Sequence, residues 1–258
     1  MDNLFANIVT KLRAAGCVFA EDEARLLILA ASTPAGLTAM VERRADGLPL
    51  EYVIGWAEFC SLRIAVEPGV FIPRRRTEFL VRQAAALARP GAVVVDLCCG
   101  TGAVGMAVAA SQEGIELHAA DIDPAAVRCA RRNVTAAGGH VYEGDLYEPL
   151  PITLQGRVDV LVVNAPYVPT EEIRLLPAEA RIHEARAALD GGGDGLDIQR
   201  RVAAEALCWL APDGCLLIET SARQASQTAE IFVRNGLIPQ AASCDEWEAT
   251  VVIGTRST

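Results

Sequence analysis

The stretch AVVVDLCCGTGAVG (residues 92–105) decides the fold class, because it joins a predicted strand to a glycine-rich turn and a helix. Five of the six residues in 92–97 are apolar, which is typical of a strand inside a sheet. Asp121 follows this turn by about 20 residues, the distance found in cofactor-binding turns of this kind. The three glycines have the spacing Gly-x-Gly-x-x-Gly, at Gly100, Gly102 and Gly105. This spacing predicts a turn that binds a cofactor containing adenosine.

Apolar runs and helical periods alternate from residue 73 onward. Strands are expected at 92–97, 116–120, directly before Gly144, 158–163, 215–220 and 249–254. Helices are expected between them, over 103–112, 125–138, 195–210 and 222–236. Since the strands are apolar throughout and separated by helices, the sequence predicts an α/β fold: a doubly wound, Rossmann-like, mostly parallel sheet with helices on both faces.

The first 72 residues have a different pattern from the rest of the chain. Residues 1–48 have apolar residues at helical spacing, and Pro34 is expected to open a third short helix. Residues 49–72 show no helical period, and their alternation together with the turn residues Glu67-Pro68-Gly69 predicts a β-hairpin linker. Three parts are therefore expected: 1–48, 49–72 and 73–258.

The composition limits the class of protein. Of the 258 residues 52% are hydrophobic, but no run of about 18 uncharged apolar residues occurs, so no membrane span is expected. The formal net charge is 23 − 33 = −10 and the pI is near 4.9, which disfavours non-specific binding to nucleic acid. The start, MDNLFANIVTKLRAAG, has no basic region before an apolar one, so no signal peptide and a cytoplasmic location are expected.

Eight cysteines are scattered over the predicted helices and strands. No Cys-x-x-Cys pair occurs, and no Cys/His group has the spacing of a zinc site. Reduced thiols that pack as small hydrophobic side chains are expected, and no metal site is predicted.

Polar side chains stand where the predicted strands end: Asp96, Asp121, Asp145 and Asn164. Ligands of open parallel sheets bind beyond the carboxyl ends of the strands. Asp121 is expected to accept from both hydroxyls of a ribose, and Asp145 from the exocyclic amine of adenine, while the Leu146 N–H meets a ring nitrogen. An acid at position 96 would face the pyrophosphate of NAD unfavourably, but suits S-adenosylmethionine, which has no phosphate and carries a sulfonium. NAD, a turn that merely contains glycine, and an Asp145 that only caps a turn are the alternatives.

The strand 158–163 ends on Asn164-Ala165-Pro166-Tyr167, which resembles the Asn-Pro-Pro-Tyr signature of methyltransferases acting on planar nitrogens. Three further segments, PLEYVIGWAEF (49–59), VFIPRRRTEFL (70–80) and HEARAALDGGGDGLDIQRRV (183–202), resemble the HemK/PrmC family. Members of this family are protein N(5)-glutamine methyltransferases that modify the Gly-Gly-Gln motif of peptide-chain release factors. The resemblance covers roughly residues 49 to 255.

The resemblance implies a class I methyltransferase fold with seven strands, a helical N-terminal domain for substrate recognition, S-adenosylmethionine as cofactor, and a monomer that acts on a protein. The residues that match the family's catalytic corner are Asn164, Ala165, Pro166 and Tyr167. Those that match its cofactor site are Asp96, Cys98, Cys99, Gly100, Thr101, Gly102, Asp121, Ile122, Asp145, Leu146 and Asn164.

The chemistry of an amide acceptor accounts for these residue types. An amide nitrogen is a poor nucleophile, because its lone pair is delocalised into the carbonyl. The Asn164 side-chain oxygen and the Ala165 carbonyl would hold its two N–H groups, and so align the nitrogen with the S–CH₃ bond. Tyr167 would pack on the flat amide or near the sulfonium, where an aromatic face attracts a cation. Because the methyl donor is already activated, no strong base and no metal is required.

The chain departs from the family at several positions. The family usually has Pro at Ala165, Gly at Cys98 and Pro-Glu at Arg75-Arg76, and its helical leader is longer. The arginines of 74–76 are expected to meet an acidic group or to form a solvated corner, and Glu184 to contact substrate or a loop. Three rival functions stay open: methylation of adenine-N(6) in nucleic acid, methylation of a small molecule, and a non-catalytic partner subunit that binds the cofactor.

Overall fold

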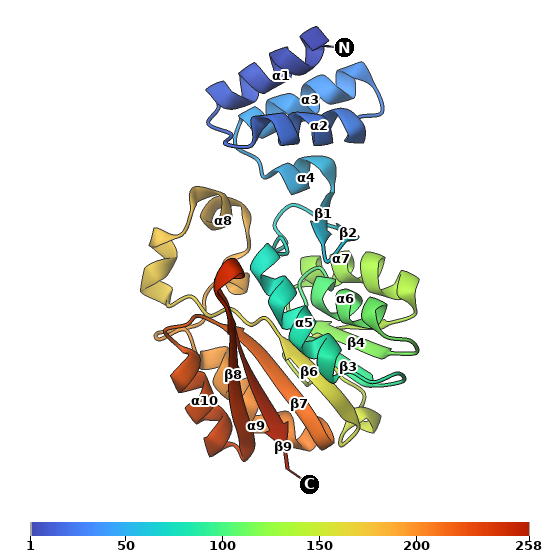
Figure 1. Ribbon diagram of the computed structural model, residues 1–258, viewed down its shortest axis with the longest axis vertical. Coiled ribbons are helices and arrows are strands. Elements are labelled where there is room, and N and C mark those ends of the chain that lie inside the picture. Colours follow the sequence, from blue (N-terminus) through green and yellow to red (C-terminus); the bar gives the residue numbers. More distant parts are fainter. Residues whose placement is uncertain (1, 258) are drawn as a thin grey trace.

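A computed structural model describes residues 2–257 (Figure 1). Its α-helices are α1 (Asp2–Ala14), α2 (Ala20–Ala30), α3 (Pro34–Ala45), α4 (Leu50–Ile54), α5 (Glu78–Leu87), α6 (Ala103–Ser111), α7 (Pro124–Val134), α8 (Ala178–His183), α9 (Asp197–Trp209) and α10 (Ala225–Arg234). Its strands are β1 (Trp56–Phe59), β2 (Leu62–Ala65), β3 (Val93–Leu97), β4 (Glu116–Asp121), β5 (His140–Glu143), β6 (Val158–Val163), β7 (Leu210–Thr220), β8 (Leu237–Cys244) and β9 (Ala249–Arg256).

Seven strands form one sheet in the order β5-β4-β3-β6-β7-β9-β8. The first five of these run parallel to one another, and β9 is antiparallel to both β7 and β8. This arrangement confirms the predicted doubly wound, mostly parallel fold. The strand β8 was not placed from the sequence, because its residues alternate between half-buried and exposed and include Pro239, as is typical of an edge strand.

Both faces of the sheet are covered, which explains the continuous apolar strands. Val94, Val160 and Leu217 belong to one buried cluster with α5, α6 and α7. The neighbouring residues Val95, Leu161, Leu216 and Ile218 belong to a second cluster with α9 and α10. Because successive side chains of a strand point to opposite faces, strands in the centre of the sheet bury apolar side chains on both sides.

The N-terminal helices α1, α2 and α3 form a separate small core around Leu12, Leu27 and Val41 (Figure 1). Helix α3 begins at Pro34, as predicted, and the Thr33 hydroxyl caps it by accepting from the Gly36 N–H at 3.0 Å. In Figure 1 these helices lie above the sheet and join it through α4 and the two-stranded hairpin β1–β2.

The prediction for the hairpin linker needs two corrections. Residues Leu50–Ile54 are the short helix α4, whose single turn is too brief to show a helical period and which ends at the left-handed Gly55. The hairpin turns at Cys60 and Ser61, whose φ values of 49° and 61° suit a tight two-residue turn, and not at Glu67-Pro68-Gly69. The alternating stretch contains strand β2, and Gly69 instead pairs with Glu184.

Candidate active site

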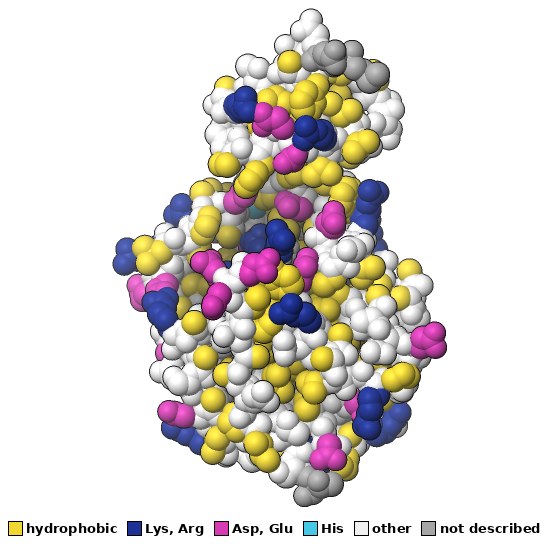
Figure 2. Space-filling view, viewed as in Figure 1, with side chains coloured by type: hydrophobic (Ala, Val, Ile, Leu, Met, Phe, Trp, Pro, Cys, Tyr) yellow, Lys and Arg dark blue, Asp and Glu magenta, His cyan; other side chains and the backbone are white. Residues whose placement is uncertain are grey.

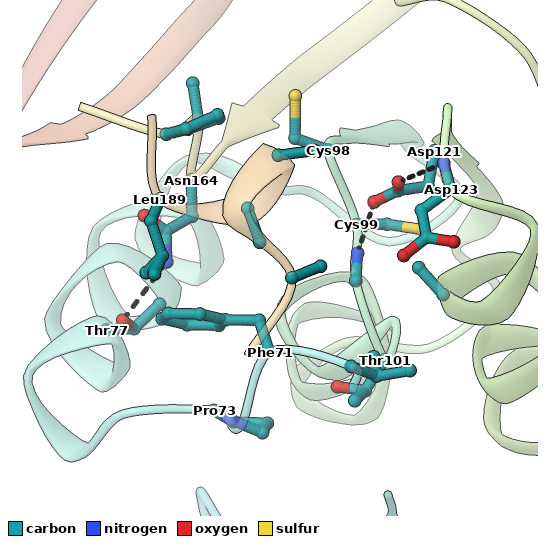
Figure 3. Close-up of a pocket in the computed structure, with 18 of the residues that line it drawn as sticks. Phe71, Pro73, Thr77, Cys98, Cys99, Thr101, Asp121, Asp123, Asn164 and Leu189 are labelled. Carbon is teal, nitrogen blue, oxygen red and sulfur yellow. Dashed lines mark hydrogen bonds between the residues drawn. The ribbon is translucent and has the colours of Figure 1, made fainter. Parts of the chain in front are cut away.

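A pocket of about 440 Å³ lies beyond the carboxyl ends of β3, β4 and β6. The chain segments 69–77 and 176–189 form its opposite wall. On the surface, Figure 2 shows a hollow between the N-terminal helices and the sheet domain, with acidic and basic side chains around it. Figure 3 shows Asn164 and Thr77 on one side of this pocket and the Asp121–Asp123 turn on the other.

Of the predicted site residues, all but Gly102 line this pocket. Gly100 and Gly102 both have left-handed backbones, with φ of 56° and 75°. A Cβ on Gly100 would meet nothing within 4 Å, whereas a Cβ on Gly102 would lie 2.6 Å from Cγ2 of Val134 in α7. The missing side chain of Gly102 therefore makes room for helix α7, a role that the sequence did not indicate.

Asp121 fixes the shape of the cofactor side of the pocket. Its Oδ2 accepts from the Gly100 N–H at 2.8 Å and its Oδ1 from the Asp123 N–H at 2.9 Å (Figure 3). Burial raises the pKa of this carboxyl. Each oxygen keeps a second lone pair, so the group still has acceptors for two hydroxyls of a ligand.

Asp96 anchors the first turn of α6. Its side chain is 1% exposed, and its Oδ2 accepts from the Gly105 N–H at 2.8 Å. Burial raises its pKa to about 7, and the charge of Asp121 adds to this effect. A positive charge in the pocket would favour the ionised form of both carboxyls.

The rim of the cofactor side combines one exposed apolar residue with a charged pair. Ile122 is 60% exposed, which leaves a flat apolar surface for a ring. Leu146 has a left-handed backbone with φ of 49° beside Asp145. The Asp145 Oδ2 lies 2.7 Å from a guanidinium nitrogen of Arg201 in α9, a partner that the sequence did not indicate.

The other side of the pocket, where the acceptor is expected, is built around the loop after β6. The Asn164 Nδ2 donates to Oγ1 of Thr77 at 3.4 Å, and Asn164 lines the pocket (Figure 3). Ala165 is 1% exposed and contributes to the wall. The Tyr167 hydroxyl donates to Oε1 of Glu219 at 3.4 Å, and the Arg76 guanidinium lies 5.8 Å from the Tyr167 ring centre.

Glu184 holds the opposite wall in place. Its Oε1 accepts from the Ile72 N–H at 3.1 Å and from Arg74 at 2.5 Å, and its side chain is buried. Burial raises the pKa of Glu184, and the Arg74 charge acts in the opposite direction. Arg74 in turn lies over the ring of Phe71, 4.8 Å from its centre. The contact that Glu184 makes within this structure is therefore with a loop.

The comparisons with known proteins agree with this geometry. The family model described as "Methyltransferase small domain" matches residues 61–208. A release factor glutamine methyltransferase of Geobacter sulfurreducens is 39% identical over 204 residues, which span 78% of this chain and 71% of that protein.

The chain belongs to the release factor glutamine methyltransferase family. A 4-amino-L-phenylalanine/4-methylamino-L-phenylalanine methyltransferase of Streptomyces pristinaespiralis is also related, at 34% identity over 83% of this chain and 75% of its own length. A solved methyltransferase structure from Pyrococcus furiosus has a TM-score of 0.59 and 16% identity, over 76% of this chain and 90% of that one, and so bears on the fold alone.

The pocket fits S-adenosylmethionine, the methyl donor of this family. Four carboxylates line its cofactor side, and a cationic ligand without phosphate suits them better than a dinucleotide does. They are Asp96, Asp121, Asp123 and Asp145. Within residues 2–257, no group of three or more His, Cys, Asp or Glu side chains could hold a metal ion, and no helix is long and apolar enough to cross a membrane.

Several residues in or behind this pocket were not predicted from the sequence. Thr77 and Glu219 support the acceptor corner, Phe71 lines the pocket, and Arg201 pairs with Asp145. Glu219 could have been predicted in the same way as Asp96, because it is an acid near the carboxyl end of an apolar strand. Thr77 and Arg201 had no such signal, because their contacts come from segments far away in the sequence.

Proposed function

We propose that this protein transfers the methyl group of S-adenosylmethionine to the side-chain amide nitrogen of glutamine, in the Gly-Gly-Gln motif of a peptide-chain release factor. The observation that carries the proposal is the orientation of Asn164. Its side-chain amide donates to Thr77 at the edge of the pocket, and we take its carbonyl oxygen as the acceptor for the substrate amide.

The residues of the corner act by holding and aligning the acceptor. Asn164 Oδ1 and the Ala165 carbonyl accept the two N–H groups of the glutamine amide, which removes their freedom to rotate. When bound, S-adenosylmethionine supplies a methyl group already activated by the sulfonium. Phe71 and Tyr167 close the acceptor side with apolar surface and exclude water. Alignment of this kind is worth about 7–11 kcal/mol of the barrier at best.

The rest of the chain supports a protein substrate, and we propose that the enzyme acts in the cytoplasm. We assign residues 1–48 to substrate recognition, 49–72 to a linker and 73–258 to catalysis. The helices α1 to α3 lie above the hollow seen in Figure 2, where a substrate loop would enter. The net charge of −10 disfavours nucleic acid as the acceptor. We further propose that the enzyme acts as a monomer.

Transfer of a labelled methyl group tests this function. The protein is incubated with methyl-labelled S-adenosylmethionine and a purified release factor, and mass spectrometry locates the label. Label on the motif glutamine, absent when that glutamine is replaced by alanine, is expected. Asn164→Ala should lower turnover by about 100-fold or more while calorimetry shows nearly unchanged cofactor affinity. If Asn164→Ala methylates at the normal rate, the corner does not hold the acceptor.

A second candidate acceptor is an aromatic amine, and the Streptomyces pristinaespiralis relative favours it. The nitrogen of such an amine also carries two N–H groups and a delocalised lone pair, so the same corner would hold it. The assay therefore includes 4-amino-L-phenylalanine as a competing acceptor. Label on this amine and none on the release factor would replace the first proposal by the second.

A further inference from the structure

Glu219 is a buried acid that lies one contact behind the acceptor pocket. It stands near the carboxyl end of β7, is 2% exposed and does not line the pocket. Its Oε1 is 3.4 Å from the Tyr167 hydroxyl and 3.4 Å from the Arg76 Nε. Its Oε2 has no partner with hydrogen-bond geometry among the described residues. Both of its partners do line the pocket.

The contacts join three segments that are distant in the sequence. Arg76 comes from the 3-10 turn Arg75–Thr77, Tyr167 from the loop after β6, and Glu219 from β7. Arg76 also lies over the Tyr167 ring, so each of the three residues contacts the other two. Because Thr77 follows Arg76 directly and receives the Asn164 amide, the same turn also orients Asn164.

A carboxylate removed from water is costly to the fold, and an apolar side chain would fill its place more cheaply. Glu219 can only accept hydrogen bonds when ionised, so it selects one orientation of the Tyr167 hydroxyl. Burial and the Glu219 charge both raise the pKa of Tyr167, which keeps that hydroxyl protonated as a donor. Burial also raises the pKa of Glu219, while Thr77 and Arg76 lower it.

We propose that Glu219 is a positioning residue for methyl transfer: its buried carboxylate sets the Tyr167 ring and the Arg76 side chain that form the wall of the acceptor pocket. It does not contact the acceptor or the cofactor. The kinetic part of this inference rests on the proposed function, whereas the contact between Glu219 and Tyr167 does not.

The test uses the full chain with Glu219→Gln, which keeps the shape and removes the charge. Turnover should fall about tenfold, since small displacements at a reacting centre are costly. Cofactor affinity by calorimetry should stay within about twofold, because the cofactor is held by other residues. The matched control is Glu230→Gln on the exposed side of α10, which should change neither quantity.

Two further measurements separate positioning from general stability. In a Tyr167→Phe background, Glu219→Gln should cause a smaller further loss of turnover than in the wild type, because the hydroxyl contact is already absent and the contact with Arg76 remains. Tyrosine labelled with ¹³C at Cζ gives one NMR signal for each of the four tyrosines, and Tyr167→Phe identifies the relevant one. Glu219→Gln should shift that signal in the cofactor-free protein.

Each result decides the proposal. An unchanged Tyr167 signal, or an equal loss of turnover in both backgrounds, would overturn it. If Glu219→Gln does not fold, Tyr167→Phe alone must lower turnover several-fold with intact cofactor binding, and no loss would overturn the proposal. A wild-type protein that methylates no acceptor would refute the proposed function, while the NMR signal would still decide the role of Glu219.

Discussion

Gly100 and Gly102 have similar backbones, but their missing side chains face different neighbours. Gly100→Ala should cost about 1 kcal/mol of stability from its left-handed backbone and weaken cofactor binding about tenfold or more, because the new methyl group enters the pocket. Gly102→Ala should lower the free energy of unfolding by about 2–4 kcal/mol, because its Cβ collides with Val134. Urea denaturation and calorimetry on both variants measure the two effects, and a reversed pattern would contradict this assignment.

Ala165 stands where the family usually has proline, and its backbone carbonyl serves as well as that of proline. Pro166 already keeps residue 165 out of the helical region. Among residues 2–257, the Ala165 N–H makes no backbone hydrogen bond of the kind found in loops and turns. A proline at this position would therefore remove no hydrogen bond of that kind. Ala165→Pro should leave activity within about fivefold and raise stability by about 0.4–1 kcal/mol. A melting curve and an initial-rate assay check this, and a variant both destabilised and inactive would show that the buried corner has no room for the ring.

Among single residues, the sequence predicted those that line the pocket better than those that hold the lining residues in place. Asp121 and Asn164 were found because parallel strands bring their carboxyl ends to one edge of a sheet. The contact between Gly102 and α7 was not predicted, because it depends on how a distant helix packs. Glu219 and Thr77 act through contacts between distant segments, and no local pattern contains that information.

Among the elements, Arg44 joins three helices. It pairs with Glu23 of α2 at 2.6 Å and with Glu179 of α8 at 2.9 Å, and the Arg44 and Glu23 side chains are 13% and 11% exposed. Arg44→Met leaves Glu23 largely buried without its cation, so the free energy of unfolding should fall by about 2–4 kcal/mol. The exposed pair of Arg25 and Asp22 gives the matched control, and Arg25→Met should cost at most about 0.5 kcal/mol. Equal losses in urea denaturation would show that burial of the pair is irrelevant.

Elements with long apolar runs were predicted to within a few residues, as β6 and β3 show. The elements that escaped prediction have weak local patterns. Strand β8 lies at the edge of the sheet, and its residues alternate between half-buried and exposed. Helix α4 is a single turn that begins after Pro49 and ends at Gly55. For such elements the tertiary neighbours decide the structure.

For the molecule as a whole, buried acids give stability an unusual dependence on pH. Burial raises the pKa of Asp96 from 3.8 to about 7, so between these values the folded state binds more protons than the unfolded state. The contribution of Asp96 to stability is therefore complete below the lower pKa and is lost as pH rises through the higher one. Asn does not titrate, so the Asp96→Asn variant does not lose this stability. In the cofactor-free protein, its free energy of unfolding relative to that of the wild type should therefore rise by roughly several kcal/mol from pH 4 to pH 8. Denaturation of both proteins across that range checks it, and a constant difference would contradict the assignment.

Val134 contacts two turns at once, and this limits how the sequence can evolve. A Cβ on Gly102 or on Gly139 would lie 2.6 Å from one or the other of its methyl groups, so this one side chain opposes a substitution at both positions. A lineage that loses Gly102 first should pass through a less stable intermediate, because the new side chain meets Val134. One that first replaces Val134 by alanine makes a small cavity and removes this clash, which leaves the left-handed backbone at Gly102 and the contact with Leu117 at Gly139 as the remaining costs. The order of mutations, and not only their identity, therefore decides which relatives of this enzyme can be reached.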